Sequence, residues 1–260
     1  MKIKTKIILF TCILCIVSIF SATLINYKFL AGELLNETEE NARNEAKITA
    51  KEMDKWLSIQ KNSLKEMADA IGYNNSYEFD YMYQYLKSQE EVNEGNNYFI
   101  GLSNNSFVSG SGWIPPDDYK PIEKDWYINA KNTDNVVVFS PYIDSRTGDI
   151  VITISKAIKR NGQLIGVLGS DIFVDYLVEL VSSIDLGKDS YGFLIDGEGN
   201  IITHKNEAFN PDPEEGFTNI NEILDGKLKD IFKTEKTAKK GLNKIKDYDG
   251  KERVFFIEDM

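Results

Sequence analysis

An uncharged and mostly apolar run extends from Ile7 to Ile25, directly after lysines at positions 2, 4 and 6. A helix rises about 1.5 Å per residue, so a run of this length is about long enough to cross a bilayer. A cleaved signal peptide is the alternative, but the run is longer than a typical signal-peptide core and no convincing small-x-small cleavage site follows it. The pattern favours an uncleaved anchor over residues 1–30, with its basic end in the cytoplasm and the rest of the chain outside the cell.

Helical periodicity continues from residue 31 to residue 72, where apolar positions recur at spacings of three and four. The stripe includes Met53, Trp56, Leu64, Met67 and Ile71. Residues 36–51 are rich in Glu, Asn and Ala and poor in large apolar side chains. A helix this long exceeds the usual globular range. We expect a stalk that leaves the membrane directly, packs its second half on a folded domain and pairs with a second copy in a homodimer.

Alternating and β-branched positions predict antiparallel strands beyond this helix. The clearest pair is a hairpin of Ile150 to Ile158 with Leu164 to Ile172, turned at Asn161-Gly162. Further strands are predicted at residues 98–102, 107–113, 136–140, 191–195, 201–204, 241–248 and 253–257. Short helices are predicted at residues 78–88, 126–131, 174–184 and 220–232. This order of elements predicts an α+β fold, with one unit over residues 73–186 and a smaller one over residues 187–260.

Two local details follow from the same pattern. Asp125 precedes the helix at 126–131 and is expected to be its N-cap. The helix at 78–88 is rich in aromatic residues, and we expect its large side chains to pack in the core. These are Phe79, Tyr81, Met82, Tyr83 and Tyr85.

Charge and motif content narrow the possible functions. The formal net charge is −11, and residues 31–260 alone carry −15, which repels nucleic acid and anionic lipid. Both cysteines, Cys12 and Cys15, lie in the apolar run, so the exported part has no disulfide. The one histidine, His204, lacks metal-ligand spacing, and no nucleophile–base or phosphate-binding motif is present. We predict a binding module with no enzymatic activity, no cofactor and no metal.

Aromatic and charged side chains gather at turns and strand ends between residues 119 and 171. The candidate site residues are Tyr119, Lys124, Trp126, Tyr127, Tyr142 and Asp171. Aromatic faces attract ammonium groups and a carboxylate pairs with them, so the set predicts a pocket for a small zwitterion or cation. The alternative is that the aromatic residues belong to the core, although a core hairpin has no need of Asp171 at its end. Trp113 and Asp144 are secondary candidates.

The spacing of this set resembles that of the double Cache extracellular sensors of bacterial chemoreceptors. The signature of that family is a Tyr, an Arg-x-Trp-Tyr that begins five residues later, a Tyr fifteen residues past the Trp-Tyr pair, and a later Asp. This sequence has matching residues at Tyr119, Trp126, Tyr127, Tyr142 and Asp171. Lys124 stands at the Arg position.

The resemblance implies a long helix packed on two PAS-like Cache modules with antiparallel sheets. Residues 73–186 would be the membrane-distal, ligand-binding module and residues 187–260 the membrane-proximal module, which lacks one family strand. A second membrane span and a cytoplasmic signalling region would follow beyond residue 260. The region most often attached in the family is a methyl-accepting chemotaxis domain, and a histidine kinase or a cyclic-dinucleotide enzyme is an alternative.

In the resembling receptors the basic residue binds the carboxylate of an amino acid and the Asp binds its ammonium group, while the aromatic residues enclose the ligand. Lysine offers a point charge where arginine makes a bidentate clamp. Lys124 therefore leaves two alternatives: weaker binding of an amino acid, or an amine or quaternary ammonium ligand that has no carboxylate. A membrane-anchored hydrolase would need a nucleophile–base pair, and the sequence shows no motif for one. An adhesion stalk would not need this set of side chains.

Overall fold

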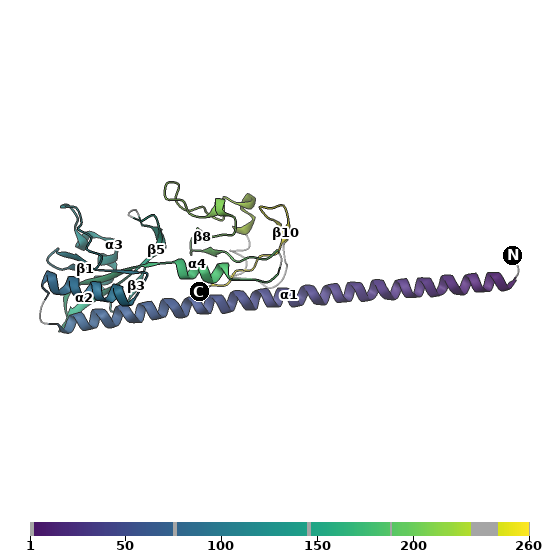
Figure 1. The fold of residues 1–260 in the computed structure, drawn as a ribbon, viewed down its shortest axis with the longest axis horizontal. Helices are drawn as coiled ribbons and strands as arrows, with labels where there is room; N and C mark the ends of the chain where they lie inside the picture. The colour runs from purple at the N-terminus through teal and green to yellow at the C-terminus, as the bar shows by residue number, and fades with distance from the viewer. Residues whose placement is uncertain (1–2, 75–76, 145–146, 188, 230–243, 260) are drawn as a thin grey trace.

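The computed structural model describes residues 3–74, 77–144, 147–187, 189–229 and 244–259. Its first element, α1 (Ile3–Tyr73), is one uninterrupted helix of 71 residues that extends well beyond the folded modules at its N-terminal end (Figure 1). Among the described residues, α1 alone is long and apolar enough to cross a membrane. The predicted anchor and stalk are therefore a single helix.

A six-stranded antiparallel sheet lies against the C-terminal half of α1, with strand order β2-β1-β6-β5-β3 and β4 paired with β5. The strands are β1 (Asn96–Leu102), β2 (Phe107–Ser109), β3 (Val137–Val138), β4 (Tyr142–Ile143), β5 (Ile150–Arg160) and β6 (Gln163–Phe173). The central hairpin β5–β6 turns at Asn161 and Gly162, whose φ angles are 48° and 82°. Both lie in the left-handed region that an Asn-Gly hairpin turn requires, so the predicted hairpin is confirmed.

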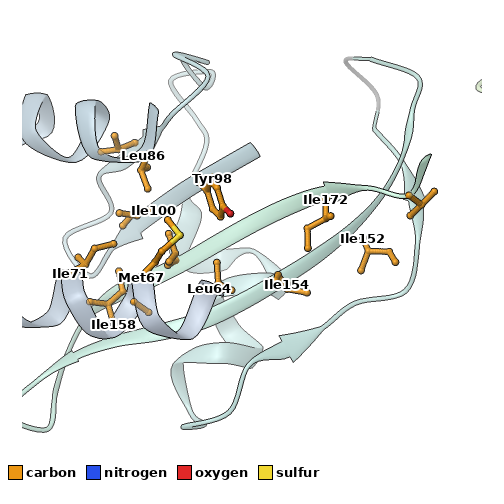
Figure 2. Close-up of a cluster of buried hydrophobic side chains, with 14 of the residues drawn as sticks. Leu64, Met67, Ile71, Leu86, Tyr98, Ile100, Ile152, Ile154, Ile158 and Ile172 are labelled. Atoms are coloured by element: carbon orange, nitrogen blue, oxygen red, sulfur yellow. The ribbon is translucent and has the colours of Figure 1, made fainter. Parts of the chain in front are cut away.

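One face of this sheet forms the main core with α1 and with α2 (Phe79–Val92). Figure 2 shows side chains of α1 beside isoleucines of β5 and β6. The labelled members are Leu64, Met67, Ile71, Leu86, Tyr98, Ile100, Ile152, Ile154, Ile158 and Ile172, and all are buried. Burial of each such side chain contributes about 1.5–3 kcal/mol, so the apolar stripe of α1 fixes the helix to the sheet.

The opposite face carries a 3-10 turn, η1 (Pro121–Glu123), and the short helix α3 (Asp125–Lys131). These two elements lie very close to β1 because residue 101 is glycine. A Cβ atom there would come within 2.8 Å of both the Pro121 Cβ and the Trp126 Cη2 atoms. The glycine therefore allows the segment that carries the predicted site to lie directly on the sheet.

The second unit follows α4 (Asp175–Ser182) and contains two small hairpins. Its elements are β7 (Leu194–Ile195), β8 (Ile201–Thr203), η2 (Glu207–Phe209), η3 (Leu224–Gly226), β9 (Ile245–Lys246) and β10 (Glu252–Arg253). It has its own cluster of buried apolar residues, but Ile202 joins the main core. Near the C-terminus the Phe256 ring centroid lies 4.4 Å from the guanidinium carbon of Arg43 on α1. The division of the chain at residue 187 stays a prediction.

Two expectations for the first unit were wrong. Phe79 and Tyr81 are exposed, at 59% and 51%, because α2 turns only one stripe, with Met82 and Leu86, toward the core. Asp125 is the first residue of α3, and Lys124 occupies the N-cap position without a capping side-chain hydrogen bond. Several other elements differ only in length: α2 continues to Val92, and β2 ends at Ser109.

The second unit has less regular structure than its sequence indicates. The helix predicted at 220–232 is replaced at its start by turns, because Leu224 and Asp225 adopt φ angles of 50° and 58° that a right-handed helix does not allow. The strand predicted at 191–195 is confined to Leu194–Ile195. Residues 230–232 and 241–243 of the predicted elements lie outside the described residues.

Candidate ligand-binding site

Asp171 is a buried carboxylate on the sheet face that carries α3. Successive strand residues point to opposite faces, and its neighbour Ile172 is in the core on the α1 side. Thr153 lies directly across the β5–β6 ladder from Asp171. Its Oγ1 donates a hydrogen bond of 2.6 Å to the Asp171 Oδ1. The fold therefore places a hydrogen-bonded carboxylate at the end of the hairpin.

Two tyrosine hydroxyls lie near this carboxylate. The Tyr142 hydroxyl is 3.2 Å from the Thr153 Oγ1, the same oxygen that bonds Asp171. Burial first, and then the negative charge of Asp171, raise the pKa of Tyr142 far above its usual value. Burial and, to a smaller extent, Asp171 also raise the pKa of Tyr119. Both hydroxyls therefore stay protonated at neutral pH and remain available as hydrogen-bond donors.

Trp126 and Tyr119 belong to a continuous group of aromatic rings beside Asp171, which we call the aromatic wall. Its members are Phe99, Phe107, Trp113, Tyr119 and Trp126, and neighbouring ring centroids lie 5.0–6.0 Å apart. The Ser155 hydroxyl on β5 donates a hydrogen bond of 2.9 Å to the Trp126 carbonyl. Such rings attract cations and exclude water from the charged groups beside them.

Lys124 contributes a positive charge next to the aromatic wall. Its Nζ lies 4.8 Å from the centroid of the Tyr119 ring, and the side chain is exposed. Within the part of the chain that the structure describes, no carboxylate forms an ion pair with this amine. The site thus combines a buried carboxylate with an exposed cation that is open to pairing with a ligand anion.

Tyr127 has a different environment from the other predicted site residues. It is 3% exposed and packs with Ala130 and Val167 beneath α3. Its ring therefore packs between α3 and the sheet. The structure brings the other five predicted residues into one neighbourhood, and of the secondary candidates Trp113 joins the aromatic wall while the charge of the buried Asp144 helps to raise the pKa of Tyr142.

The Cache domain family profile matches residues 26–260. The chain belongs to the Cache domain family. This Cache domain is 26% identical over 228 residues to the methyl-accepting chemotaxis protein McpA of Pseudomonas putida, which covers 87% of this chain and 34% of the relative. It is 26% identical over 217 residues to McpB of Bacillus subtilis, which covers 79% of this chain and 31% of the relative. The chain therefore spans about a third of the length of these curated relatives.

Solved structures of ligand-binding domains have the same fold as this Cache domain. The domain of the Pseudomonas fluorescens chemoreceptor CtaA in complex with L-serine superimposes with a TM-score of 0.59 at 25% identity, over 73% of this chain and 80% of that one. The domain of the Pseudomonas aeruginosa chemoreceptor PctC in complex with GABA has a TM-score of 0.63 at 21% identity, over 71% of this chain and 80% of that one. The α+β Cache architecture expected from the sequence is confirmed.

A separate hollow of about 410 Å³ lies in the second unit of the Cache domain. No residue of the Asp171 neighbourhood lines this hollow. Four carboxylates do line it: Glu207, Asp212, Glu215 and Glu222. Among the described residues no group of three or more His, Cys, Asp or Glu side chains is arranged to hold a metal ion. His204 is buried among aromatic rings, its Nδ1 accepts the Asn206 N–H at 2.9 Å, and burial lowers its pKa.

Sequence reasoning missed Thr153, Phe99 and Phe107 as members of the site. Phe99 and Phe107 read as ordinary strand residues, but the Phe99 ring lies over Gly169, where a Cβ atom would come within 2.3 Å of it. A glycine two residues before Asp171 was the available signal for a ring at this position. Thr153 had no comparable signal in its own segment.

Proposed function

We propose that this chain is the extracellular sensor region of a membrane-anchored chemoreceptor. We further propose that its first module, the unit over residues 73–186, binds a small amino acid. The observation that carries the proposal is that a buried, hydrogen-bonded Asp171 and the exposed amine of Lys124, which forms no ion pair with a described carboxylate, lie beside one aromatic wall. A zwitterion complements both charges at once. The ligand ammonium would pair with Asp171 and the ligand carboxylate with Lys124.

The relatives support this assignment. Ligand-binding domains of the Pseudomonas fluorescens chemoreceptor CtaA were solved with L-serine and with L-alanine, at 25% and 26% identity to this chain. The aromatic residues at positions 119, 126 and 142 would enclose the ligand backbone. Nothing in this arrangement supplies a nucleophile with a base, so the proposed role is binding without chemistry.

An amine or quaternary ammonium ligand is the second candidate. The observation that favours it is the position of the Lys124 Nζ over the Tyr119 ring, where the amine already has a favourable partner. A ligand that needs only Asp171 and the aromatic wall would leave this contact intact. The two candidates differ in whether Lys124 takes part in binding.

Signalling would proceed through α1. This helix packs on the sheet that carries Asp171 and continues without interruption into the candidate membrane span. Ligand binding would shift the first module relative to α1, within a homodimer that pairs through this helix. The output region would be a methyl-accepting chemotaxis domain, with a histidine kinase or a cyclic-dinucleotide enzyme as alternatives.

A thermal-shift screen of the full 260-residue protein in detergent micelles tests the ligand class. The panel contains the twenty common amino acids, putrescine, choline and glycine betaine. A ligand at a hundredfold over its Kd adds about 2.7 kcal/mol to the free energy of unfolding, which raises the melting temperature measurably. We expect stabilisation by amino acids and none by putrescine or choline. Stabilisation by amines alone would reject the amino-acid assignment in favour of the second candidate.

A further inference from the structure

We infer that Thr153 is a positioning residue of this site, which donates its hydroxyl proton to Asp171 and so orients that carboxylate for the ammonium group of the ligand. The inference rests on the proposed function, because it takes Asp171 as the ammonium partner. It adds a residue that belongs to no part of the Tyr, Lys, Trp, Tyr, Tyr and Asp pattern along the chain.

The geometry of the pair is that of a strong hydrogen bond. Thr153 is 5% exposed and lies directly opposite Asp171 in the ladder between β5 and β6. The Oγ1 to Oδ1 distance of 2.6 Å is in the range of an O–H donor that bonds an ionised oxygen. Hydrogen bonds to charged groups are about twice as strong as neutral ones. The threonine therefore restrains the carboxylate within a rigid hairpin.

Proton counting fixes the direction of this bond. An ionised carboxylate has no proton and accepts only, whereas Thr153 has a single hydroxyl proton to donate. The Tyr142 hydroxyl is farther away, at 3.2 Å from the Thr153 Oγ1. The single Thr153 proton therefore goes to the nearer acceptor, the Asp171 carboxylate. Oriented in this way before binding, Asp171 does not have to be ordered by the ligand.

A purely structural threonine is the competing explanation, because β-branched residues suit strands. Thr203 is a matched example, since it is 8% exposed on β8 in the second unit and makes no hydrogen bond through its side chain within the described part of the chain. Replacing a threonine with valine keeps the branched shape and removes only the hydroxyl. The same substitution at both positions separates hydrogen bonding from strand formation.

Calorimetric titration of the full chain in micelles with L-alanine, L-serine and L-leucine tests the inference. Thr153→Val should weaken binding by about tenfold or more, the cost of one hydrogen bond to a charged group. Thr153→Ser, which keeps the hydroxyl, should restore binding to within about threefold of the original protein, which is about 0.7 kcal/mol. Thr203→Val should leave the affinity unchanged. Unchanged binding in Thr153→Val, or equal losses in the valine and serine variants, would overturn the inference but not the proposed function.

A measurement without ligand tests the Thr153–Asp171 hydrogen bond independently of the proposed ligand class. If the original protein binds none of the three amino acids, the proposed ligand class fails, and the Thr153–Asp171 bond is still tested by melting temperatures. Thr153→Val should lower the melting temperature in the original protein and have little effect in Asp171→Ala, where the acceptor is gone. An equal decrease in both backgrounds would show that the Thr153 hydroxyl does not act through Asp171, and the inference would be rejected.

Discussion

At the scale of single residues, two oppositely charged side chains would determine the ligand selectivity of the proposed site. Asp171 is buried at the end of a hairpin, while Lys124 is exposed over the Tyr119 ring. The first can bind any ligand with an ammonium group, and the second matters only for a ligand that also has a carboxylate. Removing each in turn therefore distinguishes amino acids from amines.

Asp171→Ala should abolish binding of both amino acids and amines, because it removes the only partner proposed for the ammonium group. Lys124→Ala should abolish binding of amino acids but spare amines. Calorimetric titration of both variants is the measurement. Asp54→Ala and Lys55→Ala are matched controls, since both side chains are exposed on α1 far from the site in sequence. If the protein tolerates loss of Asp171 and of Lys124 equally well, the site assignment is wrong.

At this scale the sequence predicted five of the residues that the structure brings together in the candidate site, but it did not predict Thr153, and the reason lies in strand register. Counting back from the two-residue turn pairs Asp171 with Ile152. A register shift between Ile158 and Lys159 moves the pairing by one residue, so Asp171 faces Thr153 instead. A bulge is a property of the folded ladder that alternation in the sequence does not reveal.

At the scale of elements, the site depends on how closely α3 and η1 approach the sheet. The approach is possible because Gly101 has no Cβ atom, and Trp126 Cη2 occupies the space that one would fill. The strands of the main sheet other than β4, together with α3, followed from the sequence pattern. The close contact did not, because a glycine within a strand does not show which element lies over it.

Gly101→Ala should destabilise the protein by about 1–3 kcal/mol, because the added methyl group overlaps Pro121 and Trp126. It should also weaken ligand binding, since Trp126 must move. Thermal unfolding and calorimetry measure the two effects. Gly197→Ala is the matched control, because no atom lies within 4 Å of a Cβ atom placed there. Equal stability of the two variants would contradict the packing described for α3.

At the scale of the whole molecule, α1 contains the candidate membrane span at its N-terminal end and contacts both modules further along. The helix could be predicted throughout, because apolar and amphipathic patterns follow each other without a proline. The arrangement of the second module could not, since left-handed residues such as Leu224 and Asp225 break the helical pattern in a way that their residue types do not indicate.

Global stability should fall at alkaline pH because one partly buried tyrosine in each module has a raised pKa. The contribution of Tyr142 is the smaller one, because this residue is 39% exposed and solvent screens its interactions. Burial raises the pKa of Tyr142 and, together with Asp247, that of Tyr191, both from an ordinary value of 10.0. The folded state keeps these protons at pH values where the unfolded chain loses them, so this contribution to stability is complete below pH 10 and is lost as the pH rises above it. Melting temperatures between pH 8 and pH 11 are the measurement, and Tyr191→Phe should make the alkaline decrease shallower. An unchanged slope in that variant would contradict the assignment.

The central claim is that a zwitterionic amino acid binds in the first module with its ammonium group on Asp171. A crystal structure of the protein with the best ligand from the screen tests it most directly. We expect the ligand nitrogen within hydrogen-bonding distance of the Asp171 carboxylate, the ligand carboxylate beside Lys124, and the aromatic wall around its backbone. A ligand bound instead in the acidic hollow between Glu207 and Glu222, with the Asp171 neighbourhood empty, would contradict the account.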